Sequence, residues 1–273
     1  MPAVVVGPFI YVLGGNSILG TTGTVERVDS RDGSVSLLDT KLTPRYFHSA
    51  KAVGTDIYVL GGIERVGDRY SFSSRVERFD TLTGKISEMS PAPASIRTPA
   101  SVEVGGKIYV VGGSEESEKR LNTLWIYDPQ TDKWTSGAPM KVARECDVVA
   151  KGDTIYAIGG FDGENPVKTC EAYYISRNEW SDLPDLPIKT SAHHLALVGD
   201  AIFSFGDYAE MNRVQKFDLG SRTWTRLDKS GFDARRHMAV CAIDGKIYVI
   251  GGNMASRGSY LDEIQVFDAD KLR

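Results

Sequence analysis

Four histidines and three cysteines are the side chains of this sequence best suited to nucleophilic, acid–base or metal chemistry. They are His48, His193, His194, His237, Cys146, Cys170 and Cys241. The cysteines are widely spaced and form no C-x-x-C pair, so the sequence predicts neither a cysteine-rich zinc site nor a disulfide framework. We interpret them as small buried apolar residues of a protein in a reducing compartment.

The spacing of the histidines favours packing over metal binding. His48 and His193 each stand thirteen residues before a glycine, Gly61 and Gly206. A position that recurs in this way indicates a structural role in a repeat. The chain also contains no Gly-x-Ser-x-Gly, P-loop or zinc-protease motif. We therefore expect no catalytic residue, no metal ligand and no cofactor.

The elements that position these side chains are set by a repeated glycine motif. Ile10-Tyr11-Val12-Leu13-Gly14-Gly15 returns five more times, once in the degenerate form Ile202-Phe203-Ser204-Phe205-Gly206-Asp207. The first glycines stand at positions 14, 61, 112, 159, 206 and 251, with spacings of 47, 51, 47, 47 and 45 residues. Such constant spacing is typical of a repeat architecture.

Each repeat is predicted to form four short strands. A segment such as 48–53 leads through a turn into the Ile-Tyr-Val strand, which is rich in β-branched and aromatic residues. A variable loop follows the glycine pair, and then a third strand such as 74–80. A tight turn such as 128–132 leads into a fourth strand.

Aromatic residues confirm the alignment of the repeats. In three repeats a tyrosine or phenylalanine stands seven residues before a tryptophan. The pairs are Tyr127 and Trp134, Tyr173 and Trp180, and Phe217 and Trp224. Because large aromatic side chains contribute most to core packing, we interpret these rings as core residues and not as a platform for bases.

The glycine pair, the strand Val76-Glu77-Arg78 or Ile126-Tyr127-Asp128, and the seven-residue spacing to tryptophan together resemble the Kelch repeat. The resemblance covers the whole chain. It implies an all-β fold, a six-bladed Kelch β-propeller of four-stranded antiparallel blades around a central channel. The 273 residues are then one domain, with repeats at about 1–40, 41–90, 91–139, 140–186, 187–230 and 231–273.

The sixth repeat is shorter than the others. Seven residues after Phe267 would be position 274, whereas the sequence ends at Arg273. We therefore expect the last blade to lack its outer strand in this chain. We favour the interpretation that the domain was cut from a longer protein.

Composition narrows the class of partner. The formal net charge is −4, from 32 basic and 36 acidic residues, which does not favour nucleic acid or an anionic membrane as a partner. The sequence has no long apolar span and no basic leader before an apolar run. We expect a cytoplasmic protein.

Function is expected where the repeats differ, in the loops on the rigid scaffold. In the resembled family, the loop after the glycine pair and the position fourteen residues before it line the channel-mouth face that reads a partner. Carried over to this sequence, these positions are Asn16, Phe47, Ile63, Arg65, Thr98, Ser114, Glu116, Glu145, Phe161, Tyr208, Glu210, His237 and Asn253. The longest variable loops are expected over 63–73, 114–120 and 254–260.

Arginines near these positions have two interpretations. Family adaptors that read acidic degrons place arginine at the fourteen-back position, and this chain has none there. That departure puts an acidic peptide ligand in doubt. For Arg45, Arg144 and Arg235 we favour a structural ion pair or carbonyl clamp between blades, whereas Arg65 is more open to a partner.

The resemblance implies a non-catalytic domain that binds a protein or peptide, most like the substrate-recognition domain of a BTB–Kelch adaptor for a cullin ubiquitin ligase. The BTB region itself is not in this sequence, so the cullin link rests on the family alone. Two alternatives remain open: a sugar-handling enzyme like the sialic-acid mutarotase Kelch proteins, and an actin-binding scaffold. The Glu-x-x-x-Asp-x-x-x-His iron pattern of specifier Kelch proteins fails, because Lys229 stands at its glutamate position before Asp233 and His237.

Overall fold

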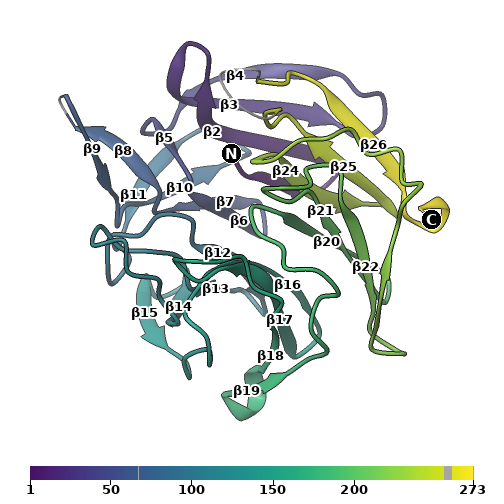
Figure 1. The fold of residues 1–273 in the computed structure, drawn as a ribbon. Helices are drawn as coiled ribbons and strands as arrows, with labels where there is room; N and C mark the ends of the chain where they lie inside the picture. The colour runs from purple at the N-terminus through teal and green to yellow at the C-terminus, as the bar shows by residue number, and fades with distance from the viewer. Residues whose placement is uncertain (67, 255–259, 273) are drawn as a thin grey trace. The chain divides into compact units, whose positions relative to one another are not determined.

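The computed structural model describes residues 1–66, 68–254 and 260–272, and in these residues the fold is built from strands (Figure 1). Contacts group the chain into two halves, Met1–Glu145 and Cys146–Arg273, which are described separately below. None of the described residues forms a helix long and apolar enough to cross a bilayer.

The N-terminal half contains three four-stranded antiparallel sheets. The first comprises β1 (Ala3–Val6), β2 (Phe9–Ser17), β3 (Gly20–Asp29) and β4 (Val35–Lys41). The second comprises β6 (Ser49–Val53), β7 (Asp56–Leu60), β10 (Val76–Asp80) and β11 (Ile86–Met89). The third comprises β12 (Ala100–Val104), β13 (Lys107–Val111), β14 (Leu124–Asp128) and β15 (Lys133–Ser136).

The C-terminal half contains two four-stranded sheets and one of three strands. The first comprises β16 (Glu145–Lys151), β17 (Thr154–Phe161), β18 (Cys170–Tyr174) and β19 (Glu179–Asp182), with the 3₁₀ turn η1 (Ile175–Arg177). The second comprises β20 (His194–Val198), β21 (Ala201–Phe205), β22 (Val214–Asp218) and β23 (Thr223–Arg226). The last comprises β24 (Ala239–Ile243), β25 (Lys246–Ile250) and β26 (Ile264–Asp268), followed by η2 (Ala269–Lys271).

These six sheets confirm the prediction of one blade per repeat. Within the described residues the sixth sheet has three strands, as the short final repeat predicts. The extent of the domain, 1–273, stays a prediction. The fold is all-β and that of a six-bladed Kelch propeller, because each sheet follows the order of strands that the repeat sets out.

The prediction of a loop over residues 63–73 is wrong. Residues 63–73 form a hairpin of β8 (Ile63–Val66) and β9 (Arg69–Phe72), and β8 pairs with the short strand β5 (Arg45–Tyr46). This small sheet has the order β5-β8-β9, so β9 is an edge strand. In Figure 1 the blue hairpin projects from the blade sheets of its own half.

Aromatic pairs fix the outer part of the blades, as predicted. Tyr127 lies opposite Trp134 across β14 and β15, with ring centroids 4.9 Å apart. Phe217 and Trp224 repeat the same arrangement at 4.9 Å. Trp134 also donates from Nε1 to the carbonyl of Ser90, 3.1 Å away in the preceding repeat. The ring therefore packs within its own blade and is hydrogen-bonded to the neighbouring one.

The glycine pair is required by backbone conformation and by close packing together. Gly61 and Gly62 have φ of +64° and +96°, values that favour glycine. A Cβ on Gly62 would lie 2.7 Å from Cβ of His48 and 2.8 Å from the carbonyl oxygen of Tyr46. A Cβ on Gly61 would likewise lie 2.8 Å from the carbonyl oxygen of Ile96, so both glycines of this pair lie where neighbouring chain segments touch.

Arg45 and Arg235 are buried structural arginines, as predicted, but each holds residues of its own repeat and not of a neighbouring blade. Arg45 is 1% exposed, donates to the carbonyls of Gly61 (3.2 Å) and Arg75 (3.1 Å), and pairs with Glu77. Arg235 is fully buried, lies 3.4 Å from the carbonyl of Gly251 and pairs with Glu263 at 2.5 Å. A buried charge needs such a partner, so these two arginines are structural.

The recurring histidines are structural as well. Nε2 of His48 lies 3.0 Å from the carbonyl oxygen of Leu13, and Nε2 of His193 lies 3.1 Å from that of Ile158. Since a carbonyl can only accept, Nε2 carries the proton in both rings. Burial lowers the pKa of both, that of His193 to about 4, so both are neutral near pH 7.

Candidate functional site

The N-terminal half presents aromatic side chains at the base and edge of the β8–β9 hairpin. The Tyr46 ring lies 5.2 Å from that of Phe47 and 6.0 Å from that of Tyr70. Tyr70 is 58% exposed, and the Arg97 guanidinium lies 5.3 Å from the centre of the Phe72 ring. Aromatic and arginine side chains that remain accessible are the residues most enriched at protein interfaces.

The predicted residues on β8, Ile63 and Arg65, differ in burial. Ile63 is buried at 6% exposure, and it lies opposite Tyr46 on one side and Phe72 on the other. The Arg65 side chain is 60% exposed and lies 3.3 Å from Asp68. The Ile63 side chain therefore packs in the interior, whereas the Arg65 side chain is accessible to solvent. Gly67 lies outside the described residues.

An ion-pair network joins two other predicted residues, Ser114 and Glu145. The Ser114 hydroxyl is buried and donates to Glu145 at 2.8 Å, while Arg97 donates to the same hydroxyl at 3.0 Å. Arg97 also pairs with Glu118 at 2.6 Å, and Arg120 approaches Glu145 at 3.2 Å. Two arginines are thus balanced by two carboxylates, which does not favour capture of an acidic ligand here.

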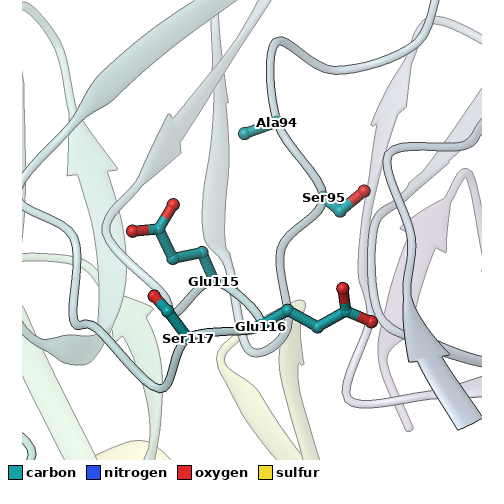
Figure 2. A pocket seen from close by; sticks show the side chains of 5 residues that line it. All are labelled: Ala94, Ser95, Glu115, Glu116 and Ser117. Carbon is teal, nitrogen blue, oxygen red and sulfur yellow. The ribbon is translucent and has the colours of Figure 1, made fainter.

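An open pocket of about 400 Å³ lies beside this network. It is lined by Ala94, Ser95, Glu115, Glu116 and Ser117. Figure 2 shows the Glu115 and Glu116 carboxylates pointing to different sides of their loop, with Glu116 on the side of Ser95. One oxygen of Glu116 accepts the backbone N–H of Phe72 at 3.2 Å. The predicted residue Glu116 therefore links the pocket to the edge of β9.

The positions fourteen residues before the glycine share an unusual backbone. Phe47, Thr98 and His237 have φ of 53°, 48° and 57°, which side chains rarely adopt. The carbonyl of Phe47 accepts the N–H of Thr98 at 2.7 Å. Glu145 is different, because β16 already begins at that residue. The constant count of fourteen therefore does not place Glu145 in the same local geometry as the other three.

The C-terminal half presents a second accessible aromatic residue, Tyr208. It is 58% exposed, and the Arg236 guanidinium lies 4.3 Å from the centre of its ring. The loop that carries Tyr208 is held by Asp207, which replaces the second glycine of the repeat. Asp207 is 2% exposed, pairs with Arg213 at 3.1 Å and accepts the N–H groups of Ala209 and Glu210.

The remaining predicted residues of this half are mostly engaged with neighbours. Glu210 pairs with Arg213 at 2.7 Å and also with Arg226. Nδ1 of His237 lies 3.0 Å from Oδ1 of Asn253, and burial lowers the pKa of His237 to about 4. Phe161 ends β17 and is half-buried. Residues 255–259, within the predicted loop 254–260, lie outside the described residues.

At the first blade, Asn16 is exposed near the end of β2, opposite Thr21 of β3. The Thr21 hydroxyl lies 3.4 Å from Oδ1 of Asn16, a long contact. The structure therefore groups the predicted residues into separate small sets in each half. Their role in partner contact stays a prediction.

The chemistry of these groups is that of recognition. Within residues 1–66, 68–254 and 260–272, no three His, Cys, Asp or Glu side chains gather as ligands for a metal ion. The carboxylates Glu145 and Glu210 are paired with arginines, whereas Glu116 accepts a backbone N–H and the half-buried His237 has a lowered pKa. The ion pairs hold these loops in place.

Three residues of the hairpin region were missed by sequence reasoning: Tyr46, Tyr70 and Phe72. The signal was the alternation of aromatic and polar residues in Arg69-Tyr70-Ser71-Phe72, which is the period of a strand. Four residues are too short a window for that pattern to stand out in a loop.

Comparison with family models gives two matches. The model described as the KLHDC2/KLHL20/DRC7 Kelch-repeats domain matches residues 1–207, and the Kelch motif matches residues 234–271. The first match alone covers more than half of the chain.

Curated relatives are Kelch-like proteins. The Kelch-like protein terF of Aspergillus terreus is 32% identical over 251 residues, which cover 83% of this chain and 54% of that protein. Kelch-like protein 38 of Rattus norvegicus is 27% identical, over 95% of this chain and 45% of its own length. The Kelch repeat and BTB domain-containing protein 12 of Danio rerio is 25% identical, over 67% of this chain and 34% of its own. The chain thus spans about half or less of the length of these relatives.

Among solved structures, the one titled "Structure of YjhT" matches with a TM-score of 0.82 over 97% of this chain and 96% of that chain. Its sequence identity is 17%, so the likeness concerns the fold alone.

Proposed function

The chain belongs to the KLHDC2/KLHL20/DRC7 Kelch-repeat family, and from this premise we propose that it is a non-catalytic protein-interaction domain. It recognises a segment of a partner protein through the side chains that its variable loops present. In the full protein this recognition selects substrates for a cullin-type ubiquitin ligase, with the recruiting function in a BTB region outside this chain.

The observation that carries the proposal is the exposure of rings and arginines on loops that rigid neighbours hold. Tyr208 is 58% exposed above Arg236, and Asp207 fixes the loop beneath it. Tyr70 has the same exposure on the β8–β9 hairpin. An exposed ring that is already held in place loses little entropy when a partner covers it.

The ligase link has narrower support. Curated relatives carry the names Kelch-like protein and Kelch repeat and BTB domain-containing protein. Co-precipitation of cullin with the full-length gene product, and its loss on deletion of any BTB region found there, tests this part separately from partner binding.

Affinity capture with a triple variant tests the binding role. Phe47→Ala, Arg65→Ala and Tyr208→Ala together remove one half-buried ring and two exposed side chains, and leave Arg45, His48 and Asp207 unchanged. We expect proteins captured by the wild-type chain to be depleted at least tenfold on the variant, since a few aromatic and arginine residues supply most of the binding energy. Val35→Ala, which changes another exposed side chain, on the outer strand β4, is the control. Equal recovery on the triple variant and the control would contradict the proposed surface.

A further inference from the structure

The edge of β9 has backbone groups available for pairing with another strand. The N–H of Ser73 donates to the carbonyl of Gly62 at 2.9 Å, so at Ser73 the backbone points toward β8. Because backbone groups alternate in direction along a strand, those of Phe72 and Tyr70 point the other way. The N–H of Phe72 points away from β8, since it donates to the carboxylate of Glu116.

Neighbouring segments cover this edge only at its C-terminal end. Ile96 forms an isolated bridge with Ser73, and the Glu116 carboxylate then takes the N–H of Phe72. Beyond that point Tyr70 is 58% exposed, and β9 has no further strand beside it in the described part of the chain. An accessible edge of this kind is a template for an added strand.

The charge at the covered end indicates the chemistry of the added strand. Glu116 is exposed, and among the described residues no lysine, arginine or histidine pairs with it. Its neighbour Glu115 approaches Lys119 only at 3.9 Å. The open pocket of about 400 Å³ beside Glu116 also contains the Ser95 hydroxyl and is large enough for a long side chain (Figure 2).

We propose that β9 binds an extended segment of the partner protein, which pairs with the backbone of Tyr70 and places a lysine or arginine in the pocket beside Glu116. This inference rests on the proposed function, because it names the kind of segment that the interaction domain takes. The backbone pairing supplies affinity that is independent of sequence, and Glu116 selects the basic residue. Tyr70, held against Tyr46, packs on the side chain of the added strand.

Fluorescence anisotropy with two synthetic peptides tests the proposal. In the first, threonine and valine alternate around one central lysine; in the second, glutamate replaces that lysine. We expect saturable binding of the lysine peptide to the wild-type protein below about 1 mM, and binding at least threefold weaker for the glutamate peptide.

Matched variants separate the two parts of the interaction. Glu116→Gln keeps an acceptor for the N–H of Phe72 but removes the charge, so it should weaken the lysine peptide about three- to tenfold and remove the preference between peptides. Glu88→Gln makes the same change on an exposed carboxylate of β11 that does not line the pocket, and it should leave both affinities unchanged. Glu116→Lys should reverse the preference.

Backbone pairing is tested from the peptide side, so that folding of the protein is not at issue. Methylation of alternate backbone nitrogens on the edge facing β9 should abolish binding, whereas methylation of the other set should not. Failure of the lysine peptide to bind, equal effects of Glu88→Gln and Glu116→Gln, or indifference to methylation would each overturn the proposal. The proposal would also be overturned if the wild-type chain formed a dimer that the lysine peptide dissociates. In that case the strand that pairs with β9 would come from a second copy of the chain.

Failure here and failure of the proposed function give different results. If the captured partners still depend on Phe47, Arg65 and Tyr208 but the lysine peptide does not bind, only the inference about β9 is wrong. If capture does not depend on these three residues and the lysine peptide does not bind either, the proposed function is wrong as well.

Discussion

Replacement of Glu77 by alanine should be among the most destabilising single changes in the chain. The Arg45 guanidinium is 1% exposed and pairs with Glu77. Glu77 also accepts the N–H and hydroxyl of Thr43, at 3.1 Å and 2.9 Å. Loss of one partner of a buried ion pair costs about 3–5 kcal/mol, because the other charge stays buried. In a chain of this size each kcal/mol shifts the melting temperature by about 2–4 °C, so we expect a decrease of roughly 10 °C.

The assay is urea unfolding followed by tryptophan fluorescence, with Glu88→Ala as the control. Glu88 lies opposite Glu77 in the same sheet but is 68% exposed, and it pairs with Arg75 at 2.8 Å. An exposed pair contributes at most about 1 kcal/mol, so this control should change stability little. The double variant Arg45→Met, Glu77→Leu should regain most of the loss, since it removes both charges of this pair and leaves Glu64, the other carboxylate near Arg45, paired with Arg75. A loss below about 1 kcal/mol for Glu77→Ala, or a double variant less stable than the single one, would refute the reasoning.

Two further changes test the structural roles of repeated residues. Burial lowers the pKa of His193 to about 4, whereas a histidine in the unfolded chain titrates near its ordinary pKa of 6.5. The unfolded state therefore binds more protons between these values, and stability should fall as pH decreases from about 6.5 to 4, by up to about 3 kcal/mol from this residue. His193→Gln should make the pH dependence of unfolding shallower in that window; an unchanged slope would show that His193 is not the source. Gly62→Ala should cost clearly more than Gly54→Ala by calorimetry. Both glycines have positive φ, but a Cβ at Gly62 meets His48 at 2.7 Å, whereas one at Gly54 meets nothing within 4 Å. Equal losses would mean that backbone conformation alone requires the glycine pair.

The blade core could be predicted from the sequence because its determinants are local and repeated. The pairing of Tyr127 with Trp134 follows from a turn of fixed length between two strands, and the same spacing recurs at Phe217 and Trp224. The glycine pairs are predictable for the same reason, since each repeat requires the same backbone at the same place.

The β8–β9 hairpin could not be predicted in this way. Its pairing with β5 joins Tyr46 to Ile63, residues that are brought together only by the strands between them. The network of Arg97, Ser114 and Glu145 is likewise made by segments far apart in sequence. The amino-acid composition of a loop therefore does not predict such contacts.

The position of Glu145 shows a further limit of counting along a repeat. Phe47, Thr98 and His237 share a left-handed backbone at the same count, but β16 begins at Glu145. Repeats therefore predict scaffold residues better than loop residues.

The measurement that tests the central claim most directly is hydrogen–deuterium exchange of the wild-type chain with and without a captured partner. Binding through the variable loops predicts protection in the segments that contain Phe47, Arg65 to Phe72 and Tyr208, with no change in the outer strands β15, β19 and β23. Protection confined to those outer strands, with the loop segments unaffected, would contradict the account.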